Sequence, residues 1–180
     1  MHERRFHGDP ARLRSPERLQ RLEVERVVEL CLADLDAASA LDVGTGTGVF
    51  AEALERRGLE VTGIDPDPGM LDIAARHAPG GLFFGCIAEE MPFADREFDL
   101  VVLAHVLHET DEPLKALREA RRVARQRVVI VEWPYVEEEH GPPLEERLRA
   151  EDIRGLVAEA GFTAVDSPAL GHMQMYRLTP

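Results

Sequence analysis

Between residues 40 and 48 the chain reads Ala40-Leu41-Asp42-Val43-Gly44-Thr45-Gly46-Thr47-Gly48. Its first residues are mostly apolar, as in a strand buried in a sheet. The glycines that follow allow a tight turn and a close approach of the main chain to a ligand. A helical pattern begins at Val49 and is stopped by Gly58. A strand, a glycine-rich turn and a helix in this order predict a ligand-binding loop at the edge of a parallel sheet.

The rest of the chain alternates between strand and helix patterns. Upstream, residues 16–38 predict one helix, with Ser15 as its capping residue. Downstream, the apolar runs predict strands over residues 39–43, 60–64, 82–84, 98–104, 127–131, 162–165 and 173–178, and helices over residues 49–57, 68–78, 113–124 and 145–160. This alternation predicts an α/β fold: a doubly wound, Rossmann-like sheet that is mostly parallel, with an antiparallel C-terminal strand.

The length of 180 residues suits one compact domain with a sizeable core. Within it, we expect residues 1–38 to form an N-terminal helical cap segment and residues 39–180 to form the ligand-binding domain.

Composition excludes several classes of partner. The 34 acidic residues outnumber the 21 Lys and Arg residues and give a net charge of −13, which repels nucleic-acid phosphates. No apolar run reaches about 18 residues and the N-terminus is polar, so neither a membrane span nor a secretory signal is predicted. Cys31 and Cys86 show no metal or disulfide spacing. A cytoplasmic location is therefore expected.

Three kinds of ligand can be weighed for the glycine loop. A phosphate-binding P-loop requires a Gly-Lys-Ser/Thr ending, and the loop contains no lysine. The dinucleotide fingerprint G-x-G-x-x-G places its third glycine where this chain has Val49, which disfavours a nicotinamide cofactor. Asp42, two residues before the first glycine, would repel a pyrophosphate but attract the cationic amino-acid end of S-adenosylmethionine.

A second carboxylate strengthens this interpretation. Asp65 lies 19 residues past Gly46, at the end of the next predicted strand, where it can accept hydrogen bonds from both ribose hydroxyls of an adenosine. Such charge-assisted hydrogen bonds contribute about 1.5–3 kcal/mol each. A purely structural role is the alternative, with Asp42 capping the loop and Asp65 beginning a turn before Pro66.

Further motifs accompany the loop: Val61-Thr62-Gly63-Ile64-Asp65, Ala88-Glu89-Glu90-Met91-Pro92-Phe93, Leu107-His108-Glu109 and Gly161-Phe162. Together with residues 40–48 they resemble class I S-adenosylmethionine-dependent methyltransferases, and among these the ubiquinone/menaquinone-biosynthesis-like group (methyltransferase type 11). The resemblance covers about residues 39–165. It implies S-adenosylmethionine as the cofactor, S-adenosylhomocysteine as its product and a small organic molecule as the methyl acceptor.

The resemblance also implies a cofactor site. Its expected residues are Asp42, Gly44, Thr45, Gly46, Thr47, Gly48, Asp65, Pro66, Met70, Ala88, Glu89, Ala104 and His105. Met70 stands where the family often packs a side chain on the adenosine. Ile87 replaces an aspartate that often accepts a hydrogen bond from the adenine amino group, which leaves adenine to the backbone at Ala88, to apolar contacts and to Glu89. Residues 124–127 stand where the family usually has Pro-Gly-Gly before its fifth strand, and we expect this to be a difference in a loop.

Candidate catalytic residues follow the fourth and fifth of the family's strands, because ligands bind outside the carboxyl ends of parallel strands. They are His105, His108, Glu132 and Tyr135. A general base contributes only if the acceptor has a proton to lose. His108 can instead hydrogen-bond the backbone, and His105 can be a wall of the cofactor site. Adding His140 to these residues gives no complete metal-ligand set, so no metal is expected.

The segment from Pro134 to Leu144 is short for a substrate lid. We therefore expect Phe6 to Ser15, or a second subunit in a homodimer, to cover the site. The leading hypothesis is a methyltransferase that acts on a small molecule. Two alternatives stay open: a non-catalytic sensor of S-adenosylmethionine or S-adenosylhomocysteine, and a nicotinamide-dependent oxidoreductase, which Val49 and Asp42 disfavour. The fold and the loop do not encode the acceptor atom.

Overall fold

The computed structural model of the chain describes residues 8–180, whose strands form one sheet in the order β3-β2-β1-β4-β5-β7-β6. The strands are β1 (Ser39–Val43), β2 (Glu60–Ile64), β3 (Leu82–Phe84), β4 (Phe98–Ala104), β5 (Ala124–Glu132), β6 (Ala164–Asp166) and β7 (Gln174–Thr179). Strands β1 to β5 are parallel, whereas β7 is antiparallel to both β5 and β6. The predicted fold class is therefore confirmed.

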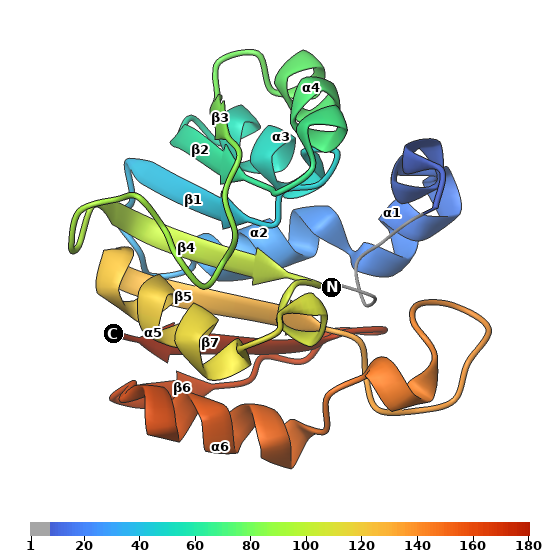
Figure 1. Cartoon of the computed structure of the whole chain (residues 1–180), viewed down its shortest axis with the longest axis vertical. Coiled ribbons are helices and arrows are strands. Elements are labelled where there is room, and N and C mark those ends of the chain that lie inside the picture. Colours follow the sequence, from blue (N-terminus) through green and yellow to red (C-terminus); the bar gives the residue numbers. More distant parts are fainter. Residues whose placement is uncertain (1–7) are drawn as a thin grey trace.

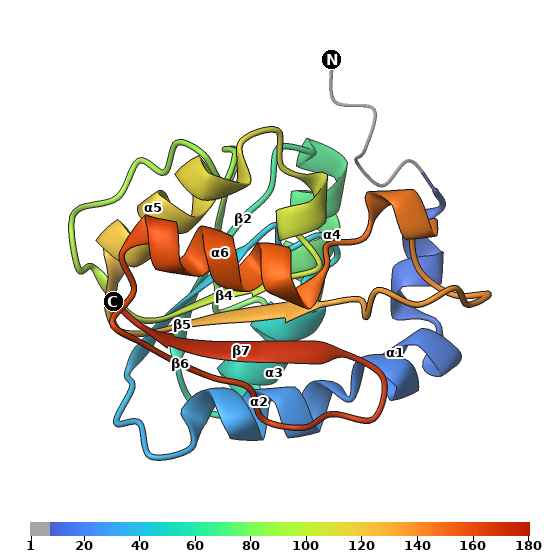
Figure 2. The same ribbon diagram turned by 90° about the horizontal axis from the view of Figure 1, so that it is seen from below.

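Helices cover both faces of the sheet. They are α1 (Pro16–Leu22), α2 (Val24–Leu32), α3 (Val49–Arg56), α4 (Pro68–His77), α5 (Pro113–Val123) and α6 (Ala150–Ala160), with 3₁₀ turns η1 (Pro10–Arg14), η2 (Leu107–Glu109) and η3 (Leu144–Glu146). Helices α5 and α6 lie on one face, and α2 and α3 lie on the other (Figure 2).

The central strands supply side chains to both faces, because successive residues of a strand point in opposite directions. In β4, Val101 and Leu103 belong to the core under α5 and α6, whereas Leu100 and Val102 belong to the core against α2 and α3. All four are buried. This two-sided burial is the physical reason for the continuous apolar run that predicted the strand.

One edge of the sheet positions the site. The parallel strands β4 and β5 end on the same side of the molecule, and α1 and the chain between β5 and α6 lie beyond those ends (Figure 1). The glycine loop follows β1 at this edge, and the predicted catalytic histidines follow β4.

The single helix predicted over residues 16–38 is wrong. Helices α1 and α2 are separated by Glu23, which has φ 49° and ψ 40°, a left-handed conformation that stops a helix. The Glu23 carboxylate accepts hydrogen bonds from the backbone N–H groups of Gly171 and His172, at 2.7 and 3.1 Å. The break between α1 and α2 therefore occurs where Glu23 contacts the loop at residues 171–172.

The end of α2 and the start of β5 also differ from the predictions. Helix α2 ends at Leu32, where the Arg127 guanidinium donates hydrogen bonds to the carbonyl oxygens of Cys31 and Ala33. Arg127 lies in β5, which begins at Ala124 and follows α5 without a loop. Residues 124–127 are thus part of a strand, because Ala124 pairs with Phe98 of β4.

Helix α6 begins at Ala150 and not at residue 145. The reason lies in Arg147, whose guanidinium is buried and donates hydrogen bonds to the carbonyl oxygens of Pro134, Val136, His140 and Pro142. These bonds fold the chain after β5 around one side chain, so its last turn, η3, stays separate from α6.

The predicted boundary between a cap segment (residues 1–38) and the domain of residues 39–180 stays a prediction. Val27 and Val28 of α2 share a buried cluster with Ala40 of β1 and Phe50 of α3. The described part of the cap segment is thus packed onto the same core as the sheet.

Candidate cofactor and active site

The glycine loop is built so that its backbone can pack closely. Gly44, Gly46 and Gly48 all have positive φ, at 63°, 50° and 77°. A Cβ on Gly44 would lie 2.4 Å from Cγ2 of Val106, and one on Gly48 would lie 2.8 Å from Cα of Ala74. A Cβ on Gly46 would make only ordinary van der Waals contacts, at 3.9 Å from Leu13 Cδ1 and 4.0 Å from the Gly44 carbonyl oxygen, and Gly46 lines the large pocket described below. Gly46 therefore leaves space that a ligand can use.

Asp42 stabilises the glycine loop through hydrogen bonds. Its Oδ2 accepts hydrogen bonds from the Thr45 hydroxyl at 2.7 Å and from the Ala51 backbone N–H at 3.1 Å. Burial raises the pKa of Asp42 to about 7, although these two hydrogen bonds oppose the change. Because a nearby cation favours the ionised form, a cationic ligand would restore its charge. Asp42 thus combines the structural role weighed above with a place in the wall of the pocket.

Asp65 is oriented toward the loop. Its Oδ2 accepts a hydrogen bond from the Gly46 N–H at 2.9 Å, and its Oδ1 accepts one from the Asp67 N–H at 2.9 Å. Asp65 also lines the large pocket described below, where a carboxylate can accept hydrogen bonds from ribose hydroxyls.

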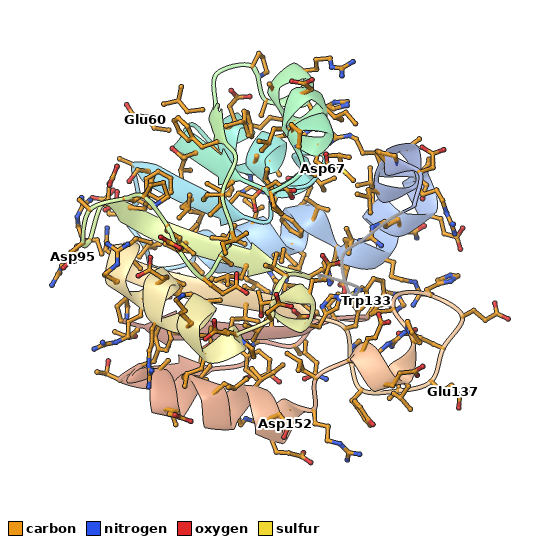
Figure 3. All side chains as sticks on the ribbon, viewed as in Figure 1. Glu60, Asp67, Asp95, Trp133, Glu137 and Asp152 are labelled. Carbon is orange, nitrogen blue, oxygen red and sulfur yellow. The ribbon has the colours of Figure 1, made fainter. Side chains whose placement is uncertain are left out.

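A pocket of about 990 Å³ opens beside the loop. This volume is at the upper end of the range of about 300–1,000 Å³ for small-molecule sites, which suits a cofactor together with an acceptor. Asp67 and Trp133, both labelled in Figure 3, mark two sides of it. The predicted cofactor residues that line it are Asp42, Gly44, Thr45, Gly46, Thr47, Asp65, Pro66, Met70, Ala88, Glu89, Ala104 and His105. Gly48 is not among them and is instead the N-cap residue of α3.

The chemistry of these walls fits S-adenosylmethionine. Asp65 suits a ribose, and Met70 and Ile87 provide apolar surface for an adenine. The Thr47 hydroxyl is buried without a hydrogen-bond partner among residues 8–180, as expected of a group that a ligand completes. Glu89 has a structural role as well, because its Oε1 accepts hydrogen bonds from the N–H groups of Asp111 and Glu112.

His108 and Glu132 form a buried pair at the pocket. The His108 Nδ1 lies 2.7 Å from Glu132 Oε2, and the His108 N–H donates to Glu132 Oε1 at 3.2 Å. Burial by itself would lower the pKa of His108, but the Glu132 carboxylate outweighs it and the pKa is raised. His108 lines the pocket, whereas Glu132 lies behind it and is 1% exposed. The arrangement leaves Nε2 as the ring nitrogen available to a ligand.

His105 also lines the pocket, in a left-handed conformation with φ 60°. Both of its ring nitrogens are buried and have no hydrogen-bond partner among the described residues. Burial lowers the pKa of His105 well below its usual value, and the charges of Arg18 and His108 lower it further. His105 is therefore a neutral imidazole at neutral pH, with one N–H to donate.

The structure does not bring Tyr135 into the pocket. Its ring packs under the Arg149 guanidinium at 4.3 Å, and its hydroxyl accepts a hydrogen bond from Arg149. Trp133, two residues before Tyr135, does line the pocket.

Two segments, named here the cover, close this edge of the sheet: η1 with α1, and residues 134–146. Arg14 donates a hydrogen bond to the Thr47 carbonyl at 2.7 Å and pairs with Glu52. The two segments are joined by the ion pair of Arg21 with Glu138 at 2.9 Å and by a contact of His140 Nε2 with Glu17 Oε1 at 3.0 Å.

The N-terminal part of this cover was anticipated from the sequence. Of the predicted segment, Phe6 and His7 lie outside the described residues, but Arg12, Leu13 and Ser15 line the pocket. Sequence reasoning missed Arg18 on α1, which also lines it. No local signal could have found it, because it lies among charges of both signs in an ordinary helix.

Within residues 8–180, no three histidine, cysteine or acidic side chains are grouped closely enough to hold a metal. Cys31 is buried and Cys86 half-buried, and both are free thiols. No helix in that part of the chain combines the length and apolar character of a membrane span.

Residues 41–131 match a family model described as "Methyltransferase domain". The chain belongs to this methyltransferase domain family. The predicted resemblance is therefore confirmed. Demethylmenaquinone methyltransferase of Thermotoga maritima is 39% identical over 112 residues, which are 60% of this chain and 48% of that protein. The enzyme of the same name from Renibacterium salmoninarum is 34% identical over 112 residues, which are 61% of this chain and 47% of that protein.

The match thus spans about half the length of these curated methyltransferases. Among solved structures, a SAM-dependent methyltransferase from Aquifex aeolicus superimposes with a TM-score of 0.84 at 25% identity, over 95% of this chain and 98% of that one. That protein is named for its dependence on S-adenosylmethionine, which supports the cofactor predicted from the sequence.

Proposed function

We propose that this methyltransferase-family protein transfers a methyl group from S-adenosylmethionine to a small organic acceptor that loses a proton in the reaction. The observation that carries the second half of this proposal is the His108–Glu132 pair at the pocket. An imidazole held by a buried carboxylate is the arrangement of a general base. The proton is bonded to oxygen, nitrogen or an acidic carbon of the acceptor.

The cofactor, when bound, supplies an electrophilic methyl group on a sulfonium. Gly44, Gly46 and Asp65 would hold it, with the loop backbone along its amino-acid end and the carboxylate at its ribose. The acidic side chains of Asp42 and Asp65 favour a cationic ligand over a phosphate.

The remaining chemistry belongs to side chains of this chain. His108 accepts the acceptor's proton at Nε2, while Glu132 fixes the Nδ1–H tautomer and stabilises the resulting imidazolium. The cover excludes water and holds the acceptor against the loop, since alignment within about 3–3.5 Å supplies much of the rate of a displacement.

The curated relatives are named for demethylmenaquinone, so this quinone is the first acceptor to test. A non-catalytic sensor finds no support among those relatives. A cytoplasmic location and a homodimer stay predictions. Light scattering after size exclusion would measure the oligomeric state.

The test is transfer of a labelled methyl group to demethylmenaquinone and, in parallel, to fractionated cell-extract metabolites. We expect a labelled product with the wild type. His108→Asn should lose about 10²–10⁴-fold in kcat, the usual contribution of general base catalysis, and still bind S-adenosylhomocysteine in calorimetry. Absence of binding by the wild type would overturn the cofactor assignment. Full activity of His108→Asn would overturn the role of the base.

A further inference from the structure

Two hydrogen-bond donors on the Trp133 side of the pocket lack a partner. The Nε of Arg18 is buried and has no hydrogen-bond partner among residues 8–180, and the same is true of both ring nitrogens of His105. Arg18 and His105 both line the pocket, and the Arg18 charge acts on the His105 ring. Buried polar groups normally have partners, so an uncompensated pair at a pocket indicates groups that a ligand satisfies.

Trp133 holds both side chains in place. The Arg18 guanidinium carbon lies 5.6 Å from the centre of the Trp133 ring, and the centre of the His105 ring lies 5.1 Å from it. Trp133 is 3% exposed and also packs against Gly141 and the Arg147 guanidinium. The two donors therefore share a rigid base, which reduces the entropy lost when a ligand binds.

The charges of the pocket indicate what these donors bind. Asp42, Asp65 and Asp67 line the side near the glycine loop and would repel an anion. Arg18 carries a permanent positive charge. Burial lowers its pKa from the usual value, and the Glu109 carboxylate opposes this change. A neutral His105 beside it can donate one N–H without adding a second charge.

We propose that Arg18 and His105 form a carboxylate-binding subsite, for the carboxylate of the cofactor's amino-acid end or for a carboxylate of the methyl acceptor. The inference rests on the proposed function, since it assigns part of the same pocket. Its chemistry is a charge-assisted hydrogen bond from the Arg18 guanidinium and a neutral one from the His105 imidazole.

The first arm of the test is calorimetry with S-adenosylhomocysteine and with its decarboxylated analogue, which lacks only the carboxylate. If the carboxylate is the cofactor's, Arg18→Gln weakens S-adenosylhomocysteine about tenfold or more, a change of about 1.4 kcal/mol, and leaves the analogue unchanged. His105→Phe, which keeps a ring against Trp133 but has no donor, should show the same selective loss to a smaller degree.

The second arm titrates benzoate, with benzamide as its neutral control, into protein saturated with S-adenosylhomocysteine, followed by ligand-observed NMR. If the carboxylate is the acceptor's, Arg18→Gln abolishes benzoate binding and leaves S-adenosylhomocysteine unchanged. Arg18→Lys should retain part of the binding in either arm. Arg118→Gln removes an exposed arginine of α5 that does not line the pocket and should change neither arm.

Wild-type affinity in both arms for Arg18→Gln and His105→Phe overturns the subsite, provided that thermal unfolding shows both variants folded. A wild type that does not bind S-adenosylhomocysteine overturns the proposed function instead. In that case benzoate titration of the unliganded protein decides the subsite by itself, because loss of binding in Arg18→Gln supports it and unchanged or absent binding contradicts it.

Discussion

At the scale of single residues, the loop separates glycines that serve packing from the one that serves a ligand. Gly44 and Gly48 are closely contacted by Val106 and Ala74, so a side chain on either would clash inside the protein. Gly46 has the same left-handed backbone, but it lines the pocket and an added Cβ would clash with no protein atom. Substitutions in the same loop should therefore have different consequences.

Gly46→Ala tests this distinction, with Gly58→Ala as its matched control. Gly58 has φ 86° and no atom within 4 Å of an added Cβ, and it is not among the pocket residues. Each substitution places a side chain in a left-handed conformation and should cost about 1–2 kcal/mol of unfolding free energy. In calorimetry only Gly46→Ala should weaken S-adenosylhomocysteine. Equal affinities of the two variants would argue against a ligand above Gly46.

The His108–Glu132 pair predicts a pH dependence. A base acts in its neutral form, so kcat/KM should rise as pH increases through the raised pKa of His108 and then reach a plateau. Glu132→Gln removes the carboxylate that raises this pKa, so the acid limb should move to lower pH while kcat falls. Glu109→Gln should move the limb in the same direction but less, because Glu109 Oε1 is 3.8 Å from Nε2. An unshifted profile in Glu132→Gln would exclude His108 as the titrating group.

Sequence reasoning identified the residues whose signal is local. The glycine spacing, Asp42 and Asp65 are read within one strand and one turn, and the structure brings them to one pocket. Arg18 and Trp133 meet there from segments more than a hundred positions apart. Their proximity depends on the path of the whole chain, which single-residue patterns do not contain.

At the scale of elements, the predicted bounds of β1, β2, β3 and β4 agree with the structure. The clearest signal is that of β4, whose nearly continuous apolar run is buried on both faces, whereas β3 is a short and mostly exposed strand at the edge of the sheet. The break at Glu23 left no such mark, since glutamate is a good helix former. Its backbone conformation coincides with hydrogen bonds to Gly171 and His172, which are distant in sequence.

Asp99 joins elements at the edge of the sheet opposite the pocket. Its carboxylate accepts hydrogen bonds from the Ala38 and Ser39 N–H groups before β1, and from Arg125 and Gln126 in β5. Burial favours the protonated acid, but these donors outweigh burial and hold the pKa of Asp99 well below its usual value. The carboxylate therefore links the beginnings of three neighbouring strands.

Asp99→Asn should lower the unfolding free energy by about 1.5–3 kcal/mol, or about 2–4 °C in Tm for each kcal/mol. Because the folded-state pKa is lowered, this stabilisation is present above the unfolded value of about 3.9 and is lost as pH falls below it. Thermal unfolding of the wild type and the variant at pH 7 and at pH 3 measures the stabilisation and its loss at low pH. Affinity for S-adenosylhomocysteine should not change. The exposed Asp36→Asn is the control, and an equal loss of Tm there would contradict the assignment.

At the scale of the whole molecule, the cover shows how a chain with a short segment after β5 still encloses its pocket. The N-terminal segment contacts the glycine loop through Arg14, and it contacts residues 134–146 through the Arg21–Glu138 ion pair and through His140 with Glu17. The sequence predicted the N-terminal contribution from the shortness of the other segment. It did not predict these contacts, because their partners lie far apart in the chain.

Deletion of residues 1–14 should open this pocket. The truncated protein loses Arg12 and Leu13 from the wall and the Arg14 hydrogen bond to the Thr47 carbonyl. We expect the Kd for S-adenosylhomocysteine and the KM for both substrates to rise, by about tenfold or more if at least 1.4 kcal/mol of binding free energy is lost. Arg14→Ala in the full-length chain should show part of the effect. Unchanged kinetics in a folded truncated protein would mean that the segment does not cover the site.

The direction of β7 has a practical consequence. Because this last strand runs opposite to the parallel strands, Pro180 lies at the far side of the sheet from the glycine loop (Figures 1 and 2). A purification tag, fluorophore or surface linker attached behind Pro180 will point away from incoming substrates. The same group fused at the N-terminal end would extend a segment that already lines the pocket, so assays of ligand exchange are best made with C-terminal fusions.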